Sequence, residues 1–431
     1  MRRVLIVSPH FPPTNAPDHQ RVRMSLPYFR ECGWEPTVLA VDATCVDAPL
    51  DPMLAQSVPT DVPVHRVRAL PARLTRLAGL GNIGYRAWFG LKKTGNRLLA
   101  AEKFDLVYFS TTQFVVTALG PKWRRRHGVP YVVDLQDPWR TDYYERPGSP
   151  RPPGGWKYRF ARWQAARLEE PSWRDAAGFV SVSERYLTEL GERYAWFAAK
   201  PSAVIPFGAS EHDFERARSD ARIAPAFTRE SGCVHVVNVG AVGPIMRDSL
   251  EQLFAGVRAL RAANPEIAQR LRFHFIGTSY AAPGRAEPSV APVAARFGVA
   301  DLVHESTERV GYFVALRTLL AADALVIPGS NEPAYNPSKI ATCFLADKPT
   351  LAVAPSGSAL DQAVRELGFA VVASRDSGAS DVVQNFLLAL TSNSAGAQSA
   401  GRNVAEFNST HTARARTRQQ CALFERALVR P

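Results

Sequence analysis

The residue types best suited to binding an anion lie between Asp323 and Thr342. An apolar run typical of a strand ends at Pro328, and the next helix is expected to begin near Ser338, a residue type that can cap a helix. Free N–H groups at a helix N-terminus attract anions. Together with the ammonium group of Lys339, they could bind a diphosphate.

A second loop of this kind follows the apolar run 235–239. Gly240 and Gly243 would let a ligand approach the backbone closely, because glycine has no side chain. Arg247 supplies a cation at the start of the helix expected there. The alternative is an ordinary connection between a strand and a helix.

Two carboxylates, Asp134 and Asp137, leave the end of a third apolar run, 131–135. Such groups could bind a sugar hydroxyl or act as a base. A metal site is the weaker interpretation, because Asp134 could merely cap backbone groups and Asp137 would then have few partner ligands. We predict a functional role for Asp137.

The loop after the first apolar run carries Asn15 and, three residues later, Asp18, a spacing typical of a helix cap with an acidic first turn. Arg21 could add a charge-assisted contact to a phosphate there, although Asp18 would oppose anion binding. The alternative is a rigid proline-rich turn with arginines that face solvent. His10 and His19 are secondary candidates for sugar contacts, since a lone loop histidine is more often exposed or structural.

The elements that must position these residues are short apolar runs, each followed by a longer segment with helical spacing. This alternation predicts a parallel sheet, and runs without polar alternation are typical of strands covered on both faces. We therefore expect α/β domains that are doubly wound and Rossmann-like. The runs are 4–7, 37–41, 62–67, 106–109, 131–135, 179–182 and 203–207, then 235–239, 273–276, 302–304, 324–327, 350–353 and 370–372.

The two series of runs predict two tandem domains whose strand ends face a shared cleft. The polar stretch 211–229 is the expected linker, which places the domain boundary near residue 208. We predict an N-terminal domain over 1–207, a C-terminal domain over 208–405, and a final helical segment over 406–431 that packs back on the first domain.

Composition excludes several classes of protein. The chain has 431 residues, of which 46% are hydrophobic and 21% charged, so disorder has little support. The five cysteines include no C-x-x-C pair, which argues against a disulfide framework or a zinc cage and favours a reducing, cytoplasmic location. No apolar run approaches the ~20 residues of a membrane span. The net charge of +12 favours anionic partners.

The string from Gly79 to Gly84 matches the dinucleotide motif G-x-G-x-x-G. It follows a basic helical run, 72–78, whereas the motif should follow a strand. We interpret it as a glycine-rich turn, which removes the main support for a nicotinamide dehydrogenase.

Two segments resemble the GT-B glycosyltransferases that use nucleotide sugars, specifically those of retaining family 4. The run 337–352, "PSKIATCFLADKPTLA", is similar to that family's donor-binding pattern "PSKL-x-EY-x-A-x-G-K-P-V-L-A". The stretch from Leu168 to Ser183 and the run "VIPFG" ending at Gly208 are similar to its "LE … AD-x-V-x-x-x-S … V-I-P-N-G".

The resemblance implies that the N-terminal domain binds an acceptor and the C-terminal domain a nucleotide diphosphate sugar, which is transferred with retention and without a metal or other cofactor. It places Arg247 and Lys339 on the leaving diphosphate, where cations stabilise developing charge. Asp137 takes the place of the family's loop histidine. Glu332, Tyr335 and Thr342 would surround the donor sugar and ribose, and Gly243 and Ser338 are the other expected donor-binding residues.

The sequence departs from the family at several of these positions. Thr342 stands where a ribose-binding Glu is usual, and a hydroxyl holds a ribose less firmly than a carboxylate. Asp347 replaces a Gly, and Phe207 replaces an Asn. A GT-B protein that binds a nucleotide or glycan without catalysis, as a sensor or scaffold, is therefore the alternative function.

The basic residues around one aromatic segment suggest a further binding partner for the protein. Trp156, Phe160 and Trp163 have helical spacing among cations, which is typical either of an interfacial helix at an anionic membrane or of a core-facing helix. The expected acceptor is a glycan, a lipid-linked molecule or a small molecule, as in polysaccharide biosynthesis. The expected location is cytoplasmic, with peripheral contact to the membrane. Nucleic acid is not expected, because no recognition motif is present.

Overall fold

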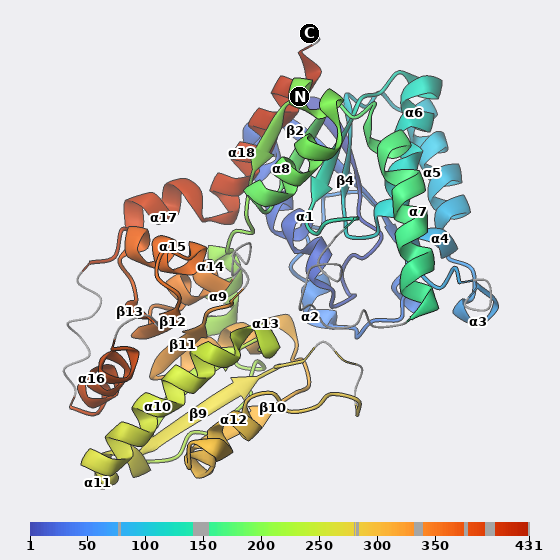
Figure 1. The fold of residues 1–431 in the computed structure, drawn as a ribbon. Coiled ribbons are helices and arrows are strands. Elements are labelled where there is room, and N and C mark those ends of the chain that lie inside the picture. Colours follow the sequence, from blue (N-terminus) through green and yellow to red (C-terminus); the bar gives the residue numbers. More distant parts are fainter. Residues whose placement is uncertain are drawn as a thin grey trace. The chain divides into compact units, whose positions relative to one another are not determined.

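The chain folds into two compact units: Met1–Gly208 together with Ala413–Pro431, and Ala209–Thr412 (Figure 1). The predicted final segment, 406–431, is thus divided at Thr412. The computed structural model describes residues 1–75, 79–140, 155–279, 281, 284–331, 339–374, 378–392 and 401–429.

The first unit contains a seven-stranded parallel sheet in the order β3-β2-β1-β4-β5-β6-β7. The chain order reverses between β1 and β4, so their carboxyl ends form the switch point at which open α/β sheets bind ligands. The strands are β1 (Arg2–Val7), β2 (Trp34–Val41), β3 (Val64–Val67), β4 (Leu106–Ser110), β5 (Tyr131–Leu135), β6 (Gly178–Ser181) and β7 (Ser202–Val204).

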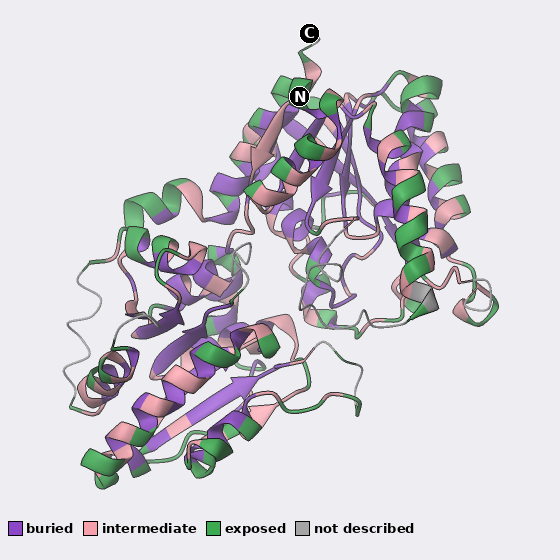
Figure 2. Ribbon diagram, viewed as in Figure 1, coloured by how far each residue is buried: buried purple, intermediate pink, exposed green. Residues whose placement is uncertain are grey.

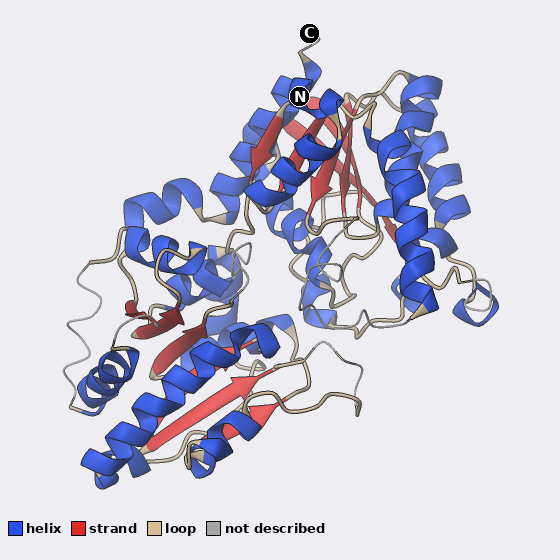
Figure 3. Cartoon of the chain, in the orientation of Figure 1, coloured by secondary structure: helices blue, strands red, loops and turns tan. Residues whose placement is uncertain are grey.

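Helices cover both faces of this sheet (Figure 3). Along β1, Leu5 and Val7 belong to the apolar cluster on one face, while Val4 and Ile6 belong to the cluster on the other, because successive residues of a strand point in opposite directions. The helices are α1 (Gln20–Ser25), α2 (Pro52–Ala55), α3 (Ala72–Thr75), α4 (Ile83–Arg86), α5 (Trp88–Ala101), α6 (Gly120–His127), α7 (Trp156–Trp173), α8 (Glu184–Arg193) and α18 (Ala413–Leu428).

The last helix, α18, belongs to the core of the first unit. Phe424 is fully buried, and its ring stacks on Phe29 with the centroids 6.2 Å apart. Gln420 is also fully buried and donates a hydrogen bond from Nε2 to Ser25 Oγ, at 2.9 Å. Helix α17 (Val404–Thr410) lies in the second unit instead, where the ring of Phe407 stacks on Phe344 at 4.0 Å. This packing explains why the predicted final segment divides.

The second unit contains a six-stranded parallel sheet in the order β10-β9-β8-β11-β12-β13. Its strands are β8 (Val234–Val239), β9 (Leu271–Ile276), β10 (Val303–Ser306), β11 (Ala324–Pro328), β12 (Thr350–Ala354) and β13 (Val371–Ser374). Its remaining helices are α9 (Glu211–Ser219), α10 (Arg247–Ala263), α11 (Pro265–Gln269), α12 (Ala291–Arg296), α13 (Tyr312–Ala321), α14 (Lys339–Ala346), α15 (Ala359–Leu367) and α16 (Ala379–Thr391).

Close helix packing supports this second sheet. Gly256 of α10 lies against α16, where an added Cβ would be 2.6 Å from Cβ of Val383. Only glycine therefore allows the two helices this approach. In both units the strands are largely buried and the exposed residues lie mainly on the helices (Figure 2). The prediction of two doubly wound Rossmann-like domains is confirmed, and each predicted strand has its counterpart in a sheet.

Candidate functional site

A cavity of about 980 Å³ opens in the second unit, beyond the carboxyl ends of β8 and β9. It is lined by the loop after β8 and the first turns of α10, by residues after β9, by α12 and by the first residue of α14. Gly243, Arg247 and Lys339, three of the predicted donor-site residues, all line it. The structure thus brings together in one cavity residues that are up to 96 positions apart in the sequence.

Lys339 reaches from α14 back over the end of β8. Its Nζ donates to the carbonyl oxygen of Ala241 at 3.2 Å and lies 3.5 Å from Oδ1 of Asn238. Asn238 is buried and donates from Nδ2 to the carbonyl oxygen of Val326 at 3.0 Å, which fixes the direction of its amide. Both of these partners of Lys339 are neutral oxygens.

Burial lowers the pKa of Lys339 to about 8. A desolvated ammonium beside neutral oxygens is destabilised relative to its neutral form. An anion entering the cavity would compensate for this lost hydration, so the ammonium favours a negatively charged ligand.

The two glycines of the β8 loop have different roles. Gly240 has a φ of +105°, and a Cβ there would lie 3.1 Å from Cε of Lys339. Gly243 has extended backbone, with a φ of −101°, and a Cβ there would meet nothing within 4 Å. The backbone at Gly240 is therefore approached by Lys339, whereas Gly243 borders the cavity without a backbone requirement for glycine.

Arg247 is the first residue of α10 and is exposed at the cavity. The first turn of α10 is anchored by Ser249, which is fully buried and donates from Oγ to the carbonyl oxygen of Gly329 at 2.8 Å. Arg247 and the N-terminus of α10 thus border the same cavity as Lys339.

Sequence reasoning missed Glu305, which shapes the far wall of the cavity. Its carboxylate accepts hydrogen bonds from Thr278 Oγ1 at 2.7 Å and from the backbone N–H groups of Ser289, Val290 and Ala291 at 2.8 to 3.0 Å. A single Glu on a short strand, β10, belongs to no motif. Only the fold shows that it holds the loop before α12.

Of the other predicted donor residues, Thr342 donates from Oγ1 to the carbonyl oxygen of Lys339, one turn earlier in α14, at 2.8 Å. Its hydroxyl is therefore bonded within its own helix. Glu332, Tyr335 and Ser338 lie outside the described residues.

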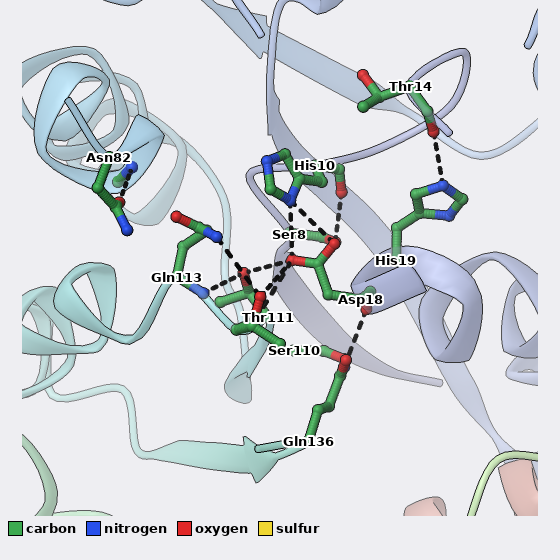
Figure 4. A network of polar contacts seen from close by, with 12 residues as sticks. Ser8, His10, Thr14, Asp18, His19, Asn82, Ser110, Thr111, Gln113 and Gln136 are labelled. Carbon is green, nitrogen blue, oxygen red and sulfur yellow. Dashed lines mark hydrogen bonds and ion pairs between the residues drawn. The ribbon is translucent and has the colours of Figure 1, made fainter. Parts of the chain in front are cut away.

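In the first unit, polar side chains gather at the carboxyl ends of β1, β4 and β5 (Figure 4). Asp18 is almost fully buried and accepts hydrogen bonds from His10 Nδ1 at 2.9 Å and from Thr111 Oγ1 at 3.1 Å. Its carboxylate also accepts from the backbone N–H and Oγ1 of Thr112. The loop after β1 is thereby tied to the loop after β4.

Asp18 thus bonds to distant side chains, and the helix cap predicted from Asn15 and Asp18 is not the one that forms. The helical segment Pro17–His19 has Ala16 at its N-cap position, with no side-chain bond there. The backbone N–H of Asn15 donates to the carbonyl oxygen of Pro49 at 2.7 Å. His19, the other loop histidine, is fully buried and bonded through Nε2 to the carbonyl oxygen of Thr14 at 2.7 Å.

Arg21 forms a buried ion pair with Asp134, with Nε donating to Oδ2 at 2.8 Å. It also donates to the carbonyl oxygen of Ile205, and its guanidinium lies 5.0 Å from the ring of Phe207. The side chains of Arg21 and Asp134 are 2% and 0% exposed, so this arginine faces neither solvent nor an open cavity. Both predictions for Arg21, a phosphate contact and a solvent-facing arginine, disagree with this position.

Asp137 lies two residues beyond β5 and is exposed at the surface. Although Asp137 reaches solvent, the protein atoms packed around its carboxyl group partly desolvate it and raise its pKa to about 6, and the nearby charge of Asp18 acts in the same direction. A carboxyl group with such a pKa can exchange a proton near neutral pH.

A second cavity, of about 560 Å³, lies in the first unit beside Thr112. Aromatic residues from α4, α7 and the loops after β4 and β5 line it, together with Arg140 and Arg162. The segment Gly79–Gly84 contributes to its wall, and Asn82 caps α4 by accepting from the N–H of Gly84 at 2.7 Å. The glycine-rich string is thus a turn before a short helix.

Residues 19–208 match the family model of the glycosyl transferase 4-like domain. The chain is similar to the GT-B glycosyltransferases of family 4. This confirms the resemblance seen in the sequence. None of the curated proteins matches the chain in sequence.

Solved structures show the same GT-B fold over nearly the whole length. Sucrose-phosphate synthase from Thermosynechococcus elongatus is 15% identical, with a TM-score of 0.59 over 99% of this chain and 98% of that one. The UDP-forming α,α-trehalose-phosphate synthase from Burkholderia xenovorans, in complex with glucose-6-phosphate, is 13% identical, with a TM-score of 0.61 over 98% and 100%. The Anabaena protein HepE, in complex with UDP-glucose, is 15% identical, with a TM-score of 0.57 over 98% of both chains.

Two further observations concern the described residues. None of their helices is long and apolar enough to cross a membrane. No group of three or more His, Cys, Asp or Glu side chains among them could hold a metal ion.

Proposed function

We propose that the protein transfers a sugar from a nucleoside diphosphate sugar to an acceptor and binds this donor in the cavity of the second unit. One observation carries the proposal: a desolvated lysine, Lys339, borders a cavity with Arg247, and its partners among the described residues are neutral oxygens. Two cations at the carboxyl edge of a doubly wound sheet suit a diphosphate better than a neutral ligand.

The chemical role of these residues follows from the charge that develops during transfer. As the bond between the sugar carbon and the diphosphate breaks, negative charge grows on the leaving oxygen. Lys339, Arg247 and the N-terminus of α10 would stabilise this charge, which is the largest contribution in many enzymes. No metal is needed for this role, and metal independence stays a prediction.

The donor class is tested by thermal unfolding of the full chain with UDP, GDP, ADP, TDP and CMP. A ligand at 100 times its Kd stabilises a protein by about 2.7 kcal/mol. We expect a rise in Tm with one nucleoside diphosphate, and UDP is the first choice because the HepE complex contains UDP-glucose.

Lys339→Ala should weaken binding of that diphosphate about 10-fold or more, since a hydrogen bond to a charged group contributes about 1.5–3 kcal/mol. Lys348→Ala is the matched control, because Lys348 lies in the same unit outside the cavity. Equal affinity of Lys339→Ala and the wild type would refute the donor site.

The alternative function, a GT-B protein that binds without catalysis, predicts the same rise in Tm but no chemistry. Release of UDP from UDP-glucose, in the presence and absence of candidate acceptors, separates the two. Glucose-6-phosphate is one acceptor to test, because the trehalose-phosphate synthase structure contains it. Glycans and lipid-linked acceptors are the others, and the resemblance to family 4 implies retention of the anomeric configuration.

An anionic membrane surface is the proposed further partner. Leu70, Leu74, Phe89 and Trp163 of the first unit are exposed large apolar residues, and the sequence from Val62 to Ala101 contains cations but no acidic residue. Apolar and basic side chains together suit anionic headgroups. Co-sedimentation with phosphatidylglycerol vesicles, but not with phosphatidylcholine vesicles, is the expected result.

A further inference from the structure

Charge is distributed unevenly around the cavity of the second unit. Lys339 and Arg247 supply cations at the first residues of α14 and α10. The segment 287–293, which leads into α12, contributes Glu287 instead, the only carboxylate among the described residues that line the cavity. Arg296 also lines the cavity, but it is paired with Glu251 of α10 at 2.6 Å.

The carboxylate of Glu287 is available to a ligand. The residue is exposed at the cavity, and it has no hydrogen bond or ion pair within the part of the chain that the structure describes. An ionised carboxylate accepts hydrogen bonds and donates none, and it repels a phosphate. Glu287 therefore suits a neutral part of the ligand that carries hydrogen-bond donors.

The loop that carries Glu287 is held in place by a second carboxylate. Glu305 of β10 accepts from the three consecutive backbone N–H groups of residues 289–291, at 2.8 to 3.0 Å. Ser289 also donates from Oγ to the carbonyl oxygen of Val242, in the loop after β8. The N–H groups before α12 thus bond to Glu305 and do not attract an anion, and the loop is positioned without a ligand.

Apolar residues complete the cavity beside these polar groups. They come from the loop after β8 and from the segment that leads into α12, and they are Val242, Pro244, Pro288, Pro292 and Val293. A volume of about 980 Å³ accommodates more than a diphosphate, since small-molecule pockets usually measure about 300–1,000 Å³. The cavity therefore offers cations for a diphosphate, apolar contacts for a base and one carboxylate for hydroxyl groups.

We propose that Glu287 binds the ribose hydroxyl groups of the donor and that Glu305 is the positioning residue of the Glu287 loop. The two oxygens of one carboxylate can accept from the 2′- and 3′-hydroxyl groups together. The inference rests on the proposed function and names its substrate class more closely. The donor is a sugar linked to a ribonucleoside diphosphate, not to a 2′-deoxyribonucleoside diphosphate such as TDP.

Isothermal titration calorimetry of the full chain with UDP, 2′-deoxy-UDP and pyrophosphate tests the ribose contact. UDP should bind about 10-fold more tightly than 2′-deoxy-UDP, because the deoxy ligand loses a hydrogen bond to a charged group. If the thermal screen favours GDP or ADP, the same comparison is made with that base. Equal affinity for the two forms, or a preference of the protein for TDP, would overturn the proposal.

Glu287→Ala should reduce the discrimination between UDP and 2′-deoxy-UDP to less than twofold. It should not weaken the binding of pyrophosphate, which has no hydroxyl group of this kind. Glu366→Ala is the matched control, because Glu366 is an exposed carboxylate of α15 outside the cavity. Discrimination that survives in Glu287→Ala refutes the contact, and an equal loss of affinity for both nucleotides would assign Glu287 to the base instead.

Glu305→Gln tests the positioning role, because an amide cannot accept all the hydrogen bonds that the carboxylate accepts. We expect weaker UDP binding and less discrimination against 2′-deoxy-UDP, with unchanged affinity for pyrophosphate. A general loss of structure would weaken both ligands alike, and unchanged UDP affinity would overturn the positioning role. Glu287→Ala, at an exposed position, tests the ribose contact even if Glu305→Gln does not fold.

The outcomes separate this inference from the proposed function. If the wild type binds neither pyrophosphate nor any nucleoside diphosphate, the proposed function fails. If UDP and pyrophosphate both bind and both depend on Lys339, but Glu287→Ala discriminates against 2′-deoxy-UDP as the wild type does, only this inference fails.

Discussion

Arg21 in the first unit and Lys339 in the second are both cations held near the carboxyl edge of a doubly wound sheet, but their partners differ in charge. Arg21 is paired with the buried carboxylate of Asp134. Lys339 has the amide oxygen of Asn238 and the carbonyl oxygen of Ala241. A paired cation contributes to the fold, whereas a cation whose partners among the described residues are neutral retains its charge for a ligand.

The largest effect is expected from breaking the pair in the first unit. Asp134→Asn leaves the Arg21 guanidinium buried without its counter-charge, which typically costs 3–5 kcal/mol. Urea unfolding of the first unit measures the loss in the free energy of unfolding. Arg174→Ala is the control, because its pair with Glu170 is exposed and screened by solvent and should contribute little to stability. Equal losses in the two variants would contradict the comparison.

The reverse change, Asn238→Asp, gives Lys339 a carboxylate of the kind that Arg21 already has. The new pair should keep Lys339 charged to higher pH and neutralise it toward ligands, so that affinity for UDP falls roughly 10- to 100-fold. Isothermal titration calorimetry checks this. Asn238→Ala removes the amide partner of Lys339 without adding a charge, so it separates the two effects. Undiminished UDP affinity in Asn238→Asp would show that the neutrality of residue 238 does not matter for binding.

The pH dependence of binding sharpens the comparison further. The pKa of Lys339 is about 8 because burial disfavours its charged form. Diphosphate affinity should therefore be highest well below pH 8 and fall as the pH rises through this value, and binding near pH 8 should take up a proton. Titrations in buffers of different ionisation enthalpy detect this uptake. A flat profile from pH 7 to 10 would rule out Lys339 as the group that titrates.

The smallest effect concerns the backbone beneath Lys339. Gly240→Ala places a Cβ at a φ of +105° and 3.1 Å from Cε of Lys339. We expect a loss of about 1–2 kcal/mol in stability from the backbone conformation and weaker UDP binding as Lys339 moves. Gly243→Ala, with extended backbone and open space, is the control and should leave stability unchanged.

The architecture was predictable because its signals are local. Apolar runs without polar alternation identify strands covered on both faces, and the alternation with helices requires parallel pairing. The run 324–327 corresponds to β11, and the run 131–135 to β5. Residue types near strand ends likewise singled out Lys339, Arg247 and Gly243, which the fold places around one cavity.

The partners of charged groups were not predictable in the same way. Asn15 and Asp18 have the spacing of a helix cap, yet Asp18 bonds to Thr111 and Thr112, which lie more than 90 residues away. The pairing of Arg21 with Asp134 spans 113 residues. Local spacing carries no information on such contacts, because they depend on which strand ends lie side by side.

The sequence by itself therefore determined the parallel α/β architecture, the resemblance to family 4 and the basic residues of the cavity in the second unit, since each depends on the order of residue types along a few turns or strands. Only the tertiary structure decided which charged side chains have a counter-charge beside them. It buried Arg21 against Asp134, held His10 against Asp18 and left Lys339 with neutral oxygens. The free energy of a charge depends on its hydration and its nearest counter-charge, and both are set by the packing of distant segments.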